Sequence, residues 1–281
     1  MRDLVVFAIL NRYLFTASVL MLRLFVFMRY LLRCLCLWCV MFVPASFAEH
    51  ISIAADRWCP FNCEAGSELP GFMVEVAERV FSKHGYEVEY IEMNWSRAIQ
   101  EARKGEVNAI MGGFKSDAPD FVYPKEELAV LENRFFVRKE SDWVYKGIDS
   151  LKTVQLGAIL GYDYGNELRA YIQESGAEEV TILNGDYHPL SHGIKLLKRH
   201  RIDVLIETGP VFWYNAKKLG LADEFKVVGL TKKAAPAYIA FSPALEDSSR
   251  YAQILSEGIR GLRASGELAS ILAKYGLEDW K

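Results

Sequence analysis

Acidic, aromatic and basic side chains follow two of the predicted strands, at points where they could hold a small polar molecule. Asp56, Trp58 and Phe61 lie just after a short β-rich run, and Trp95 and Arg97 open the helix after the next alternating segment. A carboxylate can pair with a cation, aromatic rings offer flat apolar faces, and a guanidinium can hold a carboxylate through two hydrogen bonds. The competing interpretations are packing for the tryptophans and a solvated surface position for Arg97. These five residues are therefore candidate ligand contacts.

Backbone groups offer a second kind of ligand contact. Gly112 and Gly113 end a predicted strand, where the absence of side chains would let a ligand reach N–H and C=O groups. Tyr162, Asp163 and Tyr164 form a turn, flanked by glycines, between a strand and a helix N-terminus. Unpaired amides and the helix dipole at such a turn favour an anionic group. Tyrosines in an ordinary surface turn are the alternative.

No catalytic constellation accompanies these candidates. The five histidines are scattered, and His188 and His192 lie on a polar loop and helix start that is expected to face solvent. The chain has no Gly-x-Ser-x-Gly elbow, phosphate-binding loop or His-Glu-x-x-His helix. We therefore predict no catalytic residues, no cofactor and no enzyme activity.

Residues 1–48 are predicted to form a signal peptide. A basic segment at 28–33 precedes an apolar run at 34–43, and Ser46 and Ala48 provide small side chains at a cleavage site. A retained membrane anchor is the alternative, disfavoured because arginines interrupt the run and a span needs about 20 apolar residues. The alternative start codons are Met1, Met21 and Met28. Cleavage after Ala48 and export to the periplasm are expected.

Two cysteines, Cys59 and Cys63, lie outside this leader. An even pair in an exported chain predicts a disulfide, which here would close a short loop and make it locally rigid. A zinc site is the weaker alternative, because zinc needs three or four ligands and no histidine lies at a metal-motif spacing from the pair. We therefore predict a disulfide and no metal site.

The charge balance argues against a nucleic-acid partner. The chain has 281 residues, 51% hydrophobic, with a formal net charge of −3. Without the leader, 28 basic and 35 acidic side chains remain, a net charge of −7. Phosphate binding needs a basic face that this balance does not provide. The apolar content is ample for a core and excludes a disordered chain.

Strands and helices alternate along residues 49–281, which predicts an α/β fold. In the first half the expected elements are a strand at 51–55, a helix from Gly71 to Gly85, a strand at 86–93, a helix from Trp95 to Gly105 and a strand at 107–111. In the second half they are strands at 154–160, 179–184, 202–207 and 225–230 and helices at 165–174, 190–200, 210–219, 246–264 and 266–275. We predict two lobes, each a mainly parallel sheet flanked by helices, with crossovers near 138–143 and 232–238. The expected division is lobe 1 at 49–139, lobe 2 at 140–236 and a return to lobe 1 at 237–281.

Five local strings in this order resemble the bacterial extracellular solute-binding proteins of family 3, the amino-acid-type periplasmic binding proteins. They are AADRWCPF at 54–61, PGFMV at 70–74, KGEVNAIMGG at 104–113, RIDVLIE at 201–207 and GELASILAKYG at 266–276. The resemblance covers essentially all of 49–281. It implies the type II periplasmic-binding-protein fold, a ligand between the two lobes and hinge closure around it.

The resemblance also implies roles for particular residues. The loop after the first strand and the turn at 161–165 would contact ligand, and Trp95 would stack on it. Glu207 and Thr208 match a position that commonly receives a ligand ammonium, and Tyr123 is a weaker cleft candidate. The family's arginine for a ligand α-carboxylate is absent from the segment at 115–120. An α-amino-acid ligand would therefore need Arg97 or Lys115 as its cation.

A periplasmic binding protein for a small polar solute, amino-acid-like or related, is the leading functional hypothesis. Its expected partners are the small-molecule ligand and an inner-membrane ABC transporter permease, with the protein a monomer. The alternative is an enzyme on the same fold, similar to cyclohexadienyl dehydratases, with Glu207 or Asp56 as acid or base. The last predicted helix nearly reaches Lys281, so no fused catalytic or signalling domain is expected.

Overall fold

The computed structural model describes residues 28–29, 49–184, 188–231 and 234–281. It divides into residues 1–47 and 48–281, and the description below concerns the second part. The predicted signal peptide, with its alternative of an anchor and its alternative starts, lies outside the described residues apart from 28–29. No helix within the described ranges has the length and apolar character needed to cross a membrane.

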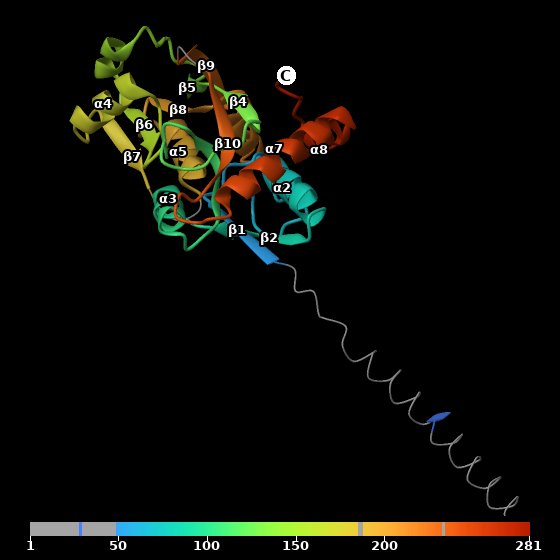
Figure 1. Cartoon of the computed structure of the whole chain (residues 1–281). Helices are drawn as coiled ribbons and strands as arrows, with labels where there is room; N and C mark the ends of the chain where they lie inside the picture. The colour runs from blue at the N-terminus through green and yellow to red at the C-terminus, as the bar shows by residue number, and fades with distance from the viewer. Residues whose placement is uncertain (1–27, 30–48, 185–187, 232–233) are drawn as a thin grey trace, which may run out of the picture. The chain divides into compact units, whose positions relative to one another are not determined.

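Lobe 1 is built on a five-stranded sheet with the order β2-β1-β3-β10-β4 (Figure 1). Its strands are β1 (Glu49–Ala55), β2 (Tyr86–Glu92), β3 (Ala109–Phe114), β4 (Ala129–Leu131) and β10 (Ala235–Phe241). The helices of this lobe are α2 (Phe72–Ser82), α3 (Trp95–Lys104), α7 (Ser248–Ala264) and α8 (Glu267–Lys274). Helices α2, α7 and α8 pack together on one face of the sheet.

Alternating side chains explain why helices cover both faces of this sheet. Ile51 and Ile53 of β1 are fully buried in the core that contains α2, α7 and α8, whereas Ala54 packs with the α3 residues Trp95 and Ala98. Successive side chains of a strand point to opposite faces, so an apolar run on both faces requires two layers of cover.

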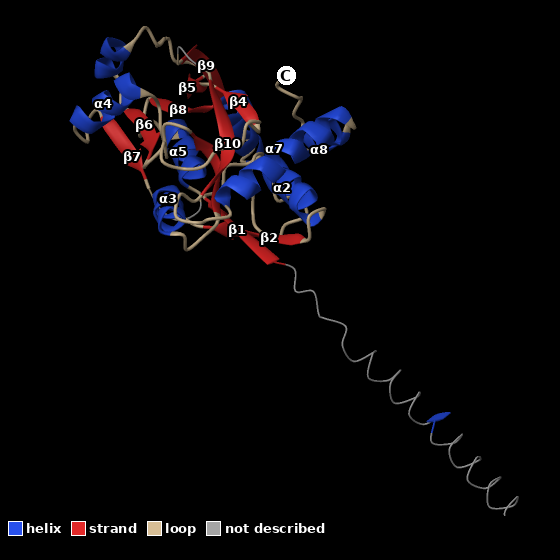
Figure 2. Cartoon of the chain, viewed as in Figure 1, coloured by secondary structure: helices blue, strands red, loops and turns tan. Residues whose placement is uncertain are grey.

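Lobe 2 is built on a second five-stranded sheet with the order β7-β6-β8-β5-β9. Its strands are β5 (Asn133–Arg138), β6 (Leu156–Ile159), β7 (Val180–Leu183), β8 (Val204–Thr208) and β9 (Phe225–Leu230). Its helices are η1 (Ile148–Thr153), α4 (Asn166–Glu174), α5 (Pro189–Lys198), α6 (Gly209–Lys218) and η2 (Ala222–Glu224). Helices again cover both faces (Figure 2). On one of them Phe136 of β5 stacks on Phe212 of α6, with 3.6 Å between the ring centroids.

Both sheets are mixed, where the sequence predicts mainly parallel ones. In lobe 1, β1 runs parallel to β2 and β3, but β10 is antiparallel to β3 and β4. In lobe 2, β6 runs parallel to β7 and β8, but β5 is antiparallel to β8 and β9. The antiparallel strands β5 and β10 are the ones that receive the chain as it passes between lobes, so their direction is set by the crossing and not by a helical connection.

The two crossings lie between β4 and β5 and between β9 and β10. The predicted crossover near 138–143 is wrong, because β5 at 133–138 already pairs with β8 in the second sheet. The expected division keeps β5 in lobe 1 and starts the return to lobe 1 at 237, whereas β10, which pairs with β3, begins at Ala235. The α/β architecture with two sheets flanked by helices is confirmed.

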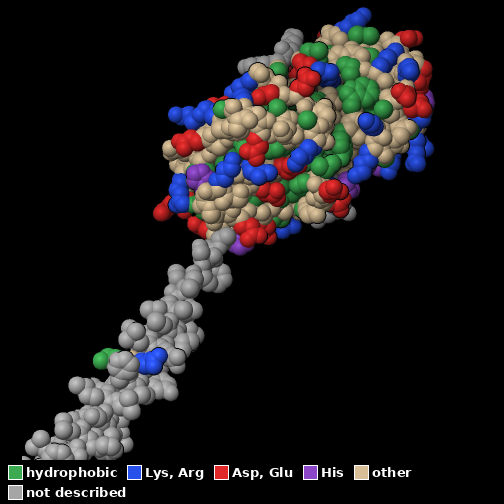
Figure 3. Space-filling view, turned by 90° about the vertical axis from the view of Figure 1, so that its right-hand side faces the viewer, with side chains coloured by type: hydrophobic (Ala, Val, Ile, Leu, Met, Phe, Trp, Pro, Cys, Tyr) green, Lys and Arg blue, Asp and Glu red, His purple; other side chains and the backbone are tan. Residues whose placement is uncertain are grey.

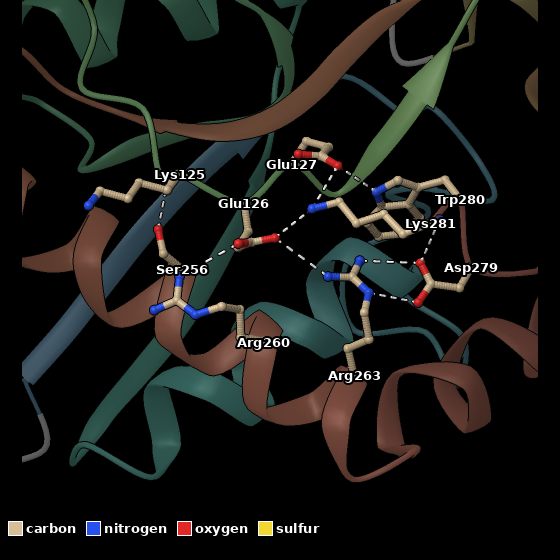
Figure 4. A network of polar contacts seen from close by, with 9 residues as sticks. All are labelled: Lys125, Glu126, Glu127, Ser256, Arg260, Arg263, Asp279, Trp280 and Lys281. Carbon is tan, nitrogen blue, oxygen red and sulfur yellow. Dashed lines mark hydrogen bonds and ion pairs between the residues drawn. The ribbon is translucent and has the colours of Figure 1, made fainter.

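Residues 279–281 form a clasp on the segment 125–127 (Figure 4). Trp280 Nε1 donates to Glu127 Oε1 at 3.0 Å, and Lys281 Nζ lies 2.6 Å from Glu126 Oε2. Arg263 of α7 holds Asp279 through Nε at 2.7 Å and covers the Trp280 ring at 5.1 Å. The clasp therefore ties residues 279–281 to α7 and to the segment 125–127, which precedes β4.

We expect the Trp280→Ala variant to lose about 1 to 3 kcal/mol of unfolding free energy, because it removes a half-buried ring and the hydrogen bond to Glu127. Urea unfolding followed by circular dichroism measures this loss. The control is Arg260→Gln, which removes a 3.6 Å ion pair between an exposed arginine and Glu126 but leaves the contacts of residues 279–281 in place, and it should change stability by less than about 0.5 kcal/mol. Equal losses in the two variants would contradict a stabilising role for the clasp.

Basic and acidic side chains are interspersed on the face shown in Figure 3. Ion pairs between described residues include the bidentate contact of Arg103 with Asp120 at 2.7 and 2.9 Å. This face offers no continuous basic surface of the kind that phosphate backbones require.

Candidate functional site

The loop after β1 is held in place by covalent and packing contacts. A disulfide joins Cys59 to Cys63, as predicted, and Trp58 exchanges a backbone hydrogen bond with Asn62. The Phe61 ring lies between those of Trp58 and Phe72, at 4.6 and 5.2 Å between centroids. The loop therefore presents Trp58 from a rigid support.

Trp58 lies at the wall of a pocket between the two lobes. The described residues that line it are Asp56, Trp58, Trp95, Met111, Gly112, Phe114, Asp117, Asn133, Tyr162, Asp163 and Glu207. Several of them lie at or just after the carboxyl ends of β1, β3, β6 or β8, where ligands bind in open α/β sheets. The pocket has a volume of about 30 Å³. It adjoins a wider cleft of about 520 Å³ that shares Phe114, Asn133 and Asp163 with it.

Direct hydrogen bonds join the lobes across this pocket. Tyr162 of lobe 2 donates its hydroxyl to Asp56 Oδ2 of lobe 1 at 2.7 Å. Trp58 Nε1 of lobe 1 donates to Glu207 Oε1 of lobe 2 at 3.2 Å. Both contacts are made by groups that sequence analysis selects as ligand contacts, so the pocket side chains of one lobe touch those of the other.

Four carboxyl groups line the pocket, and none of the described lining residues is basic. Burial raises the pKa of Asp56 to about 6, although the hydrogen bond from Tyr162 opposes it. Burial likewise raises the pKa of Asp117 to about 7 and that of Glu207 to about 7. Burial also acts on Asp163, but hydrogen bonds that include one from Arg169 lower its pKa overall. The pocket is therefore acidic, and three of its carboxyls are protonated more readily than usual.

Half of the predicted ligand contacts line the pocket. They are Asp56, Trp58, Trp95, Gly112, Tyr162, Asp163 and Glu207. Gly112 has φ +86°, and a Cβ there would lie 3.2 Å from the Trp58 ring, so glycine is needed for the close approach. Trp95, the first residue of α3, is 5% exposed and packs partly in the core while contributing to the wall.

The two predicted cations do not line the pocket. The Arg97 side chain is 69% exposed, and its Nε lies 4.0 Å from Glu101 Oε1. Lys115 Nζ lies 5.7 and 5.3 Å from the ring centroids of Tyr123 and Tyr238, outside the lining. Neither side chain therefore supplies a cation to the pocket lining.

The other predicted contacts support the lining residues. Phe61 packs behind Trp58, and Tyr123 donates its hydroxyl to the carbonyls of Phe114 and Ala118. Thr208 donates its amide to Glu207 Oε1 at 2.7 Å and its hydroxyl at 3.2 Å. Gly113 packs on Trp95 and Ile110, and the hydroxyl of Tyr164, which lines the wider cleft, accepts from the amide of Ile159.

Sequence analysis missed four residues that line the pocket: Met111, Phe114, Asp117 and Asn133. Phe114 and Asp117 lie just beyond Gly112 and Gly113, which sequence analysis places at the end of a strand as ligand contacts. Both glycines lie within β3, which extends to Phe114, so sequence analysis recognised this part of the site but not its extent. Asn133 opens β5, a strand that the sequence does not predict. In the described part of the chain, no group of three or more His, Cys, Asp or Glu side chains is placed to hold a metal ion.

Comparison with known proteins gives a consistent result. The family model for bacterial extracellular solute-binding proteins, family 3, matches residues 51–278. The arginine-binding extracellular protein ArtP of Bacillus subtilis (strain 168) is 24% identical over 225 residues, 77% of this chain and 81% of ArtP.

Two solved structures share the fold. An ancestral arginine-binding protein bound to arginine matches with a TM-score of 0.65 and 21% identity, over 80% of this chain and 97% of that one. A structure from a study of glutathione import through GshT and the cystine importer TcyBC of Streptococcus mutans matches with a TM-score of 0.69 and 20% identity, over 83% and 97%. At these identities the likeness establishes the fold alone.

Proposed function

This chain belongs to the bacterial extracellular solute-binding proteins, family 3, and we propose on that basis that it captures a small polar solute, amino-acid-like or related, between its two lobes. It has the type II periplasmic-binding-protein fold, and the binding of a small molecule is the common property of the family. The proposal for this chain is that the pocket around Asp56, Trp58 and Glu207 receives the solute.

The observation that carries this proposal is the pair of hydrogen bonds between the lobes. Asp56 meets Tyr162, and Trp58 meets Glu207, at the carboxyl ends of the strands. A solute larger than the 30 Å³ pocket enters only when the lobes separate and these contacts break. Contacts from the solute to both lobes then stabilise the closed form, which is a shift in population by differential binding.

We also propose where the protein acts and with what. Family members are extracellular or periplasmic, so a cleavable leader would deliver this chain to the periplasm. The protein would act there as a monomer. An ABC transporter permease in the inner membrane would recognise the closed form and accept the solute. The leader, apart from residues 28–29, lies outside the described residues, and the family relationship supports the permease partner.

Thermal unfolding of the exported, oxidised protein against a library of small solutes tests the proposal. A solute present at about 100 times its dissociation constant should add about 2.7 kcal/mol, or roughly 5 to 11 °C at this size. The variant Glu207→Ala should lose the shift. A matched variant at an exposed glutamate, Glu140→Ala, should keep it. If no compound of any class raises the transition, capture of a small solute is refuted.

An enzyme on the same fold is the second candidate. The buried carboxyls of Asp56 and Glu207, with pKa values raised to about 6 and about 7, are suited to proton transfer near neutral pH. The acidic lining, however, disfavours the binding of a ring-bearing acid. Incubation with a cyclohexadienyl acid should therefore yield no product above the uncatalysed rate. Turnover that disappears in Glu207→Gln would replace the binding proposal by catalysis.

A further inference from the structure

We infer that the pocket takes a cation that carries no carboxylate, a primary amine or guanidinium compound and not an α-amino acid. The inference rests on the proposed function, because it names the chemical class of the captured solute. It follows from the charges of the lining, from one carboxylate oxygen of Glu207 and from the aromatic walls.

The charges of the lining favour a cationic solute. Asp56, Asp117 and Glu207 line the pocket and form no ion pair within the part of the chain that is described. A ligand carboxylate in this pocket would face these groups with no basic partner among the described lining residues. Like charges brought together out of water oppose binding, whereas an ammonium or guanidinium would be attracted by the ionised form of each carboxyl and would favour that form.

One carboxylate oxygen of Glu207 could accept a hydrogen bond from a solute. Its Oε1 accepts from Trp58 Nε1 and from both the amide and the hydroxyl of Thr208. Glu207 is only 1% exposed, yet its buried Oε2 has no hydrogen-bond partner among the described residues. Buried carboxylate oxygens are ordinarily paired. An N–H donor from a cationic solute in the pocket would satisfy this oxygen.

Aromatic rings complete the site. Trp58, Trp95, Phe114 and Tyr162 line the pocket together with the carboxyls. The rings of Trp58 and Phe114 meet edge to face, 6.2 Å apart. Aromatic faces attract cations through the quadrupole of the ring, most strongly where water is excluded. The aromatic rings and the carboxyls of the pocket therefore both favour a positively charged solute.

Arg169 is the competing source of a carboxylate contact. Its Nη2 lies 2.5 Å from Oδ1 of Asp163, which lines the pocket. The arginine itself does not line the pocket, and its side chain is 43% exposed. If Arg169 left Asp163 to hold an α-carboxylate, an amino acid would bind as well as the corresponding amine. The experiment below separates these two arrangements.

Isothermal titration calorimetry with matched pairs tests the inference: arginine against agmatine, lysine against cadaverine, and ornithine against putrescine. Each pair shares its cation and differs in the α-carboxylate. At least one amine should bind ten-fold or more tightly than its parent amino acid. The inference is overturned if the tightest binder among these six and the solute library carries a carboxylate. If nothing binds at all, the proposed function fails together with the inference.

Variants identify the groups responsible. Glu207→Gln should weaken binding of the preferred amine at least 30-fold, whereas Glu140→Gln should leave it within two-fold. Asp117→Asn, which should also weaken amine binding, serves as the second variant if thermal unfolding shows that Glu207→Gln is not folded. Arg169→Gln should leave amine binding within two-fold. A ten-fold or greater loss in Arg169→Gln, or unchanged affinity in both carboxyl variants, would overturn the assignment.

Discussion

The Gly71→Ala variant is expected to lose about 2 to 6 kcal/mol of unfolding free energy. Gly71 precedes α2 with φ +111°, a backbone conformation that glycine adopts readily and residues with a Cβ atom rarely adopt. A Cβ at this position would lie 2.4 Å from Asn62 Cα and 2.5 Å from the carbonyl oxygen of Phe61. Both are backbone atoms of the disulfide loop, which cannot give way by a change of rotamer. The cost of the positive φ and the cost of the steric overlap with the loop backbone therefore both lower the free energy of unfolding.

Chemical unfolding of Gly71→Ala beside Gly85→Ala measures this effect. Gly85 also has a positive φ, +82°, but a Cβ there meets nothing within 4 Å. The control should therefore lose only the cost of the backbone conformation, about 1 kcal/mol. Because the displaced loop carries Trp58, Gly71→Ala should also bind solute more weakly. Equal losses in the two variants would show that contact with the loop does not limit position 71.

The ligand-free protein is expected to lose stability from its pocket carboxyls as the pH rises from about 4 to 8. Burial raises the pKa of Asp56 from 3.8 to about 6 and that of Glu207 from 4.5 to about 7. At a pH between the ordinary pKa and the raised pKa of such a group, the unfolded chain has released the proton while the folded chain still holds it. The folded state then binds more protons, so its stability falls with rising pH, by up to about 3 kcal/mol for each group.

The free energy of unfolding in urea at pH 4 and pH 8 tests this expectation by comparison with the double variant Asp56→Asn/Glu207→Gln. Ion pairs elsewhere and the pocket carboxyl of Asp117 titrate in both proteins, so the difference between the proteins isolates Asp56 and Glu207. Wild type should lose about 2 to 5 kcal/mol relative to the variant over this range. The exposed Glu140→Gln serves as control and should follow wild type. Parallel profiles for wild type and the double variant would contradict buried, protonated carboxyls.

Most elements of the fold could be predicted from the sequence because their signals are local. The helix α2 follows from apolar residues at 73, 76, 77, 80 and 81, all of which are buried on one face. The strand β8 begins with the apolar run Val204 to Ile206, which is typical of strands covered on both faces. The strand β5, which begins directly after the first crossing, has no such pattern. In β5, Asn133, Arg134 and Arg138 surround a short apolar stretch, so its place in the second sheet depends on pairing with the distant β8 and β9.

The amino-acid sequence alone was enough to predict the family resemblance, the two-lobed α/β fold, the disulfide and the types of side chain available to the site. Half of the predicted contacts line the pocket because they follow strands whose ends meet at one edge of a sheet. Only the tertiary structure decided which charges share the pocket. Asp56 follows β1, and Arg97 lies in the first turn of α3 after the neighbouring strand β2. Arg97 is exposed, whereas Asp56 is buried against Tyr162 from the other lobe. Burial and pairing of this kind depend on how residues about a hundred positions apart approach one another, and local sequence carries no record of that distance.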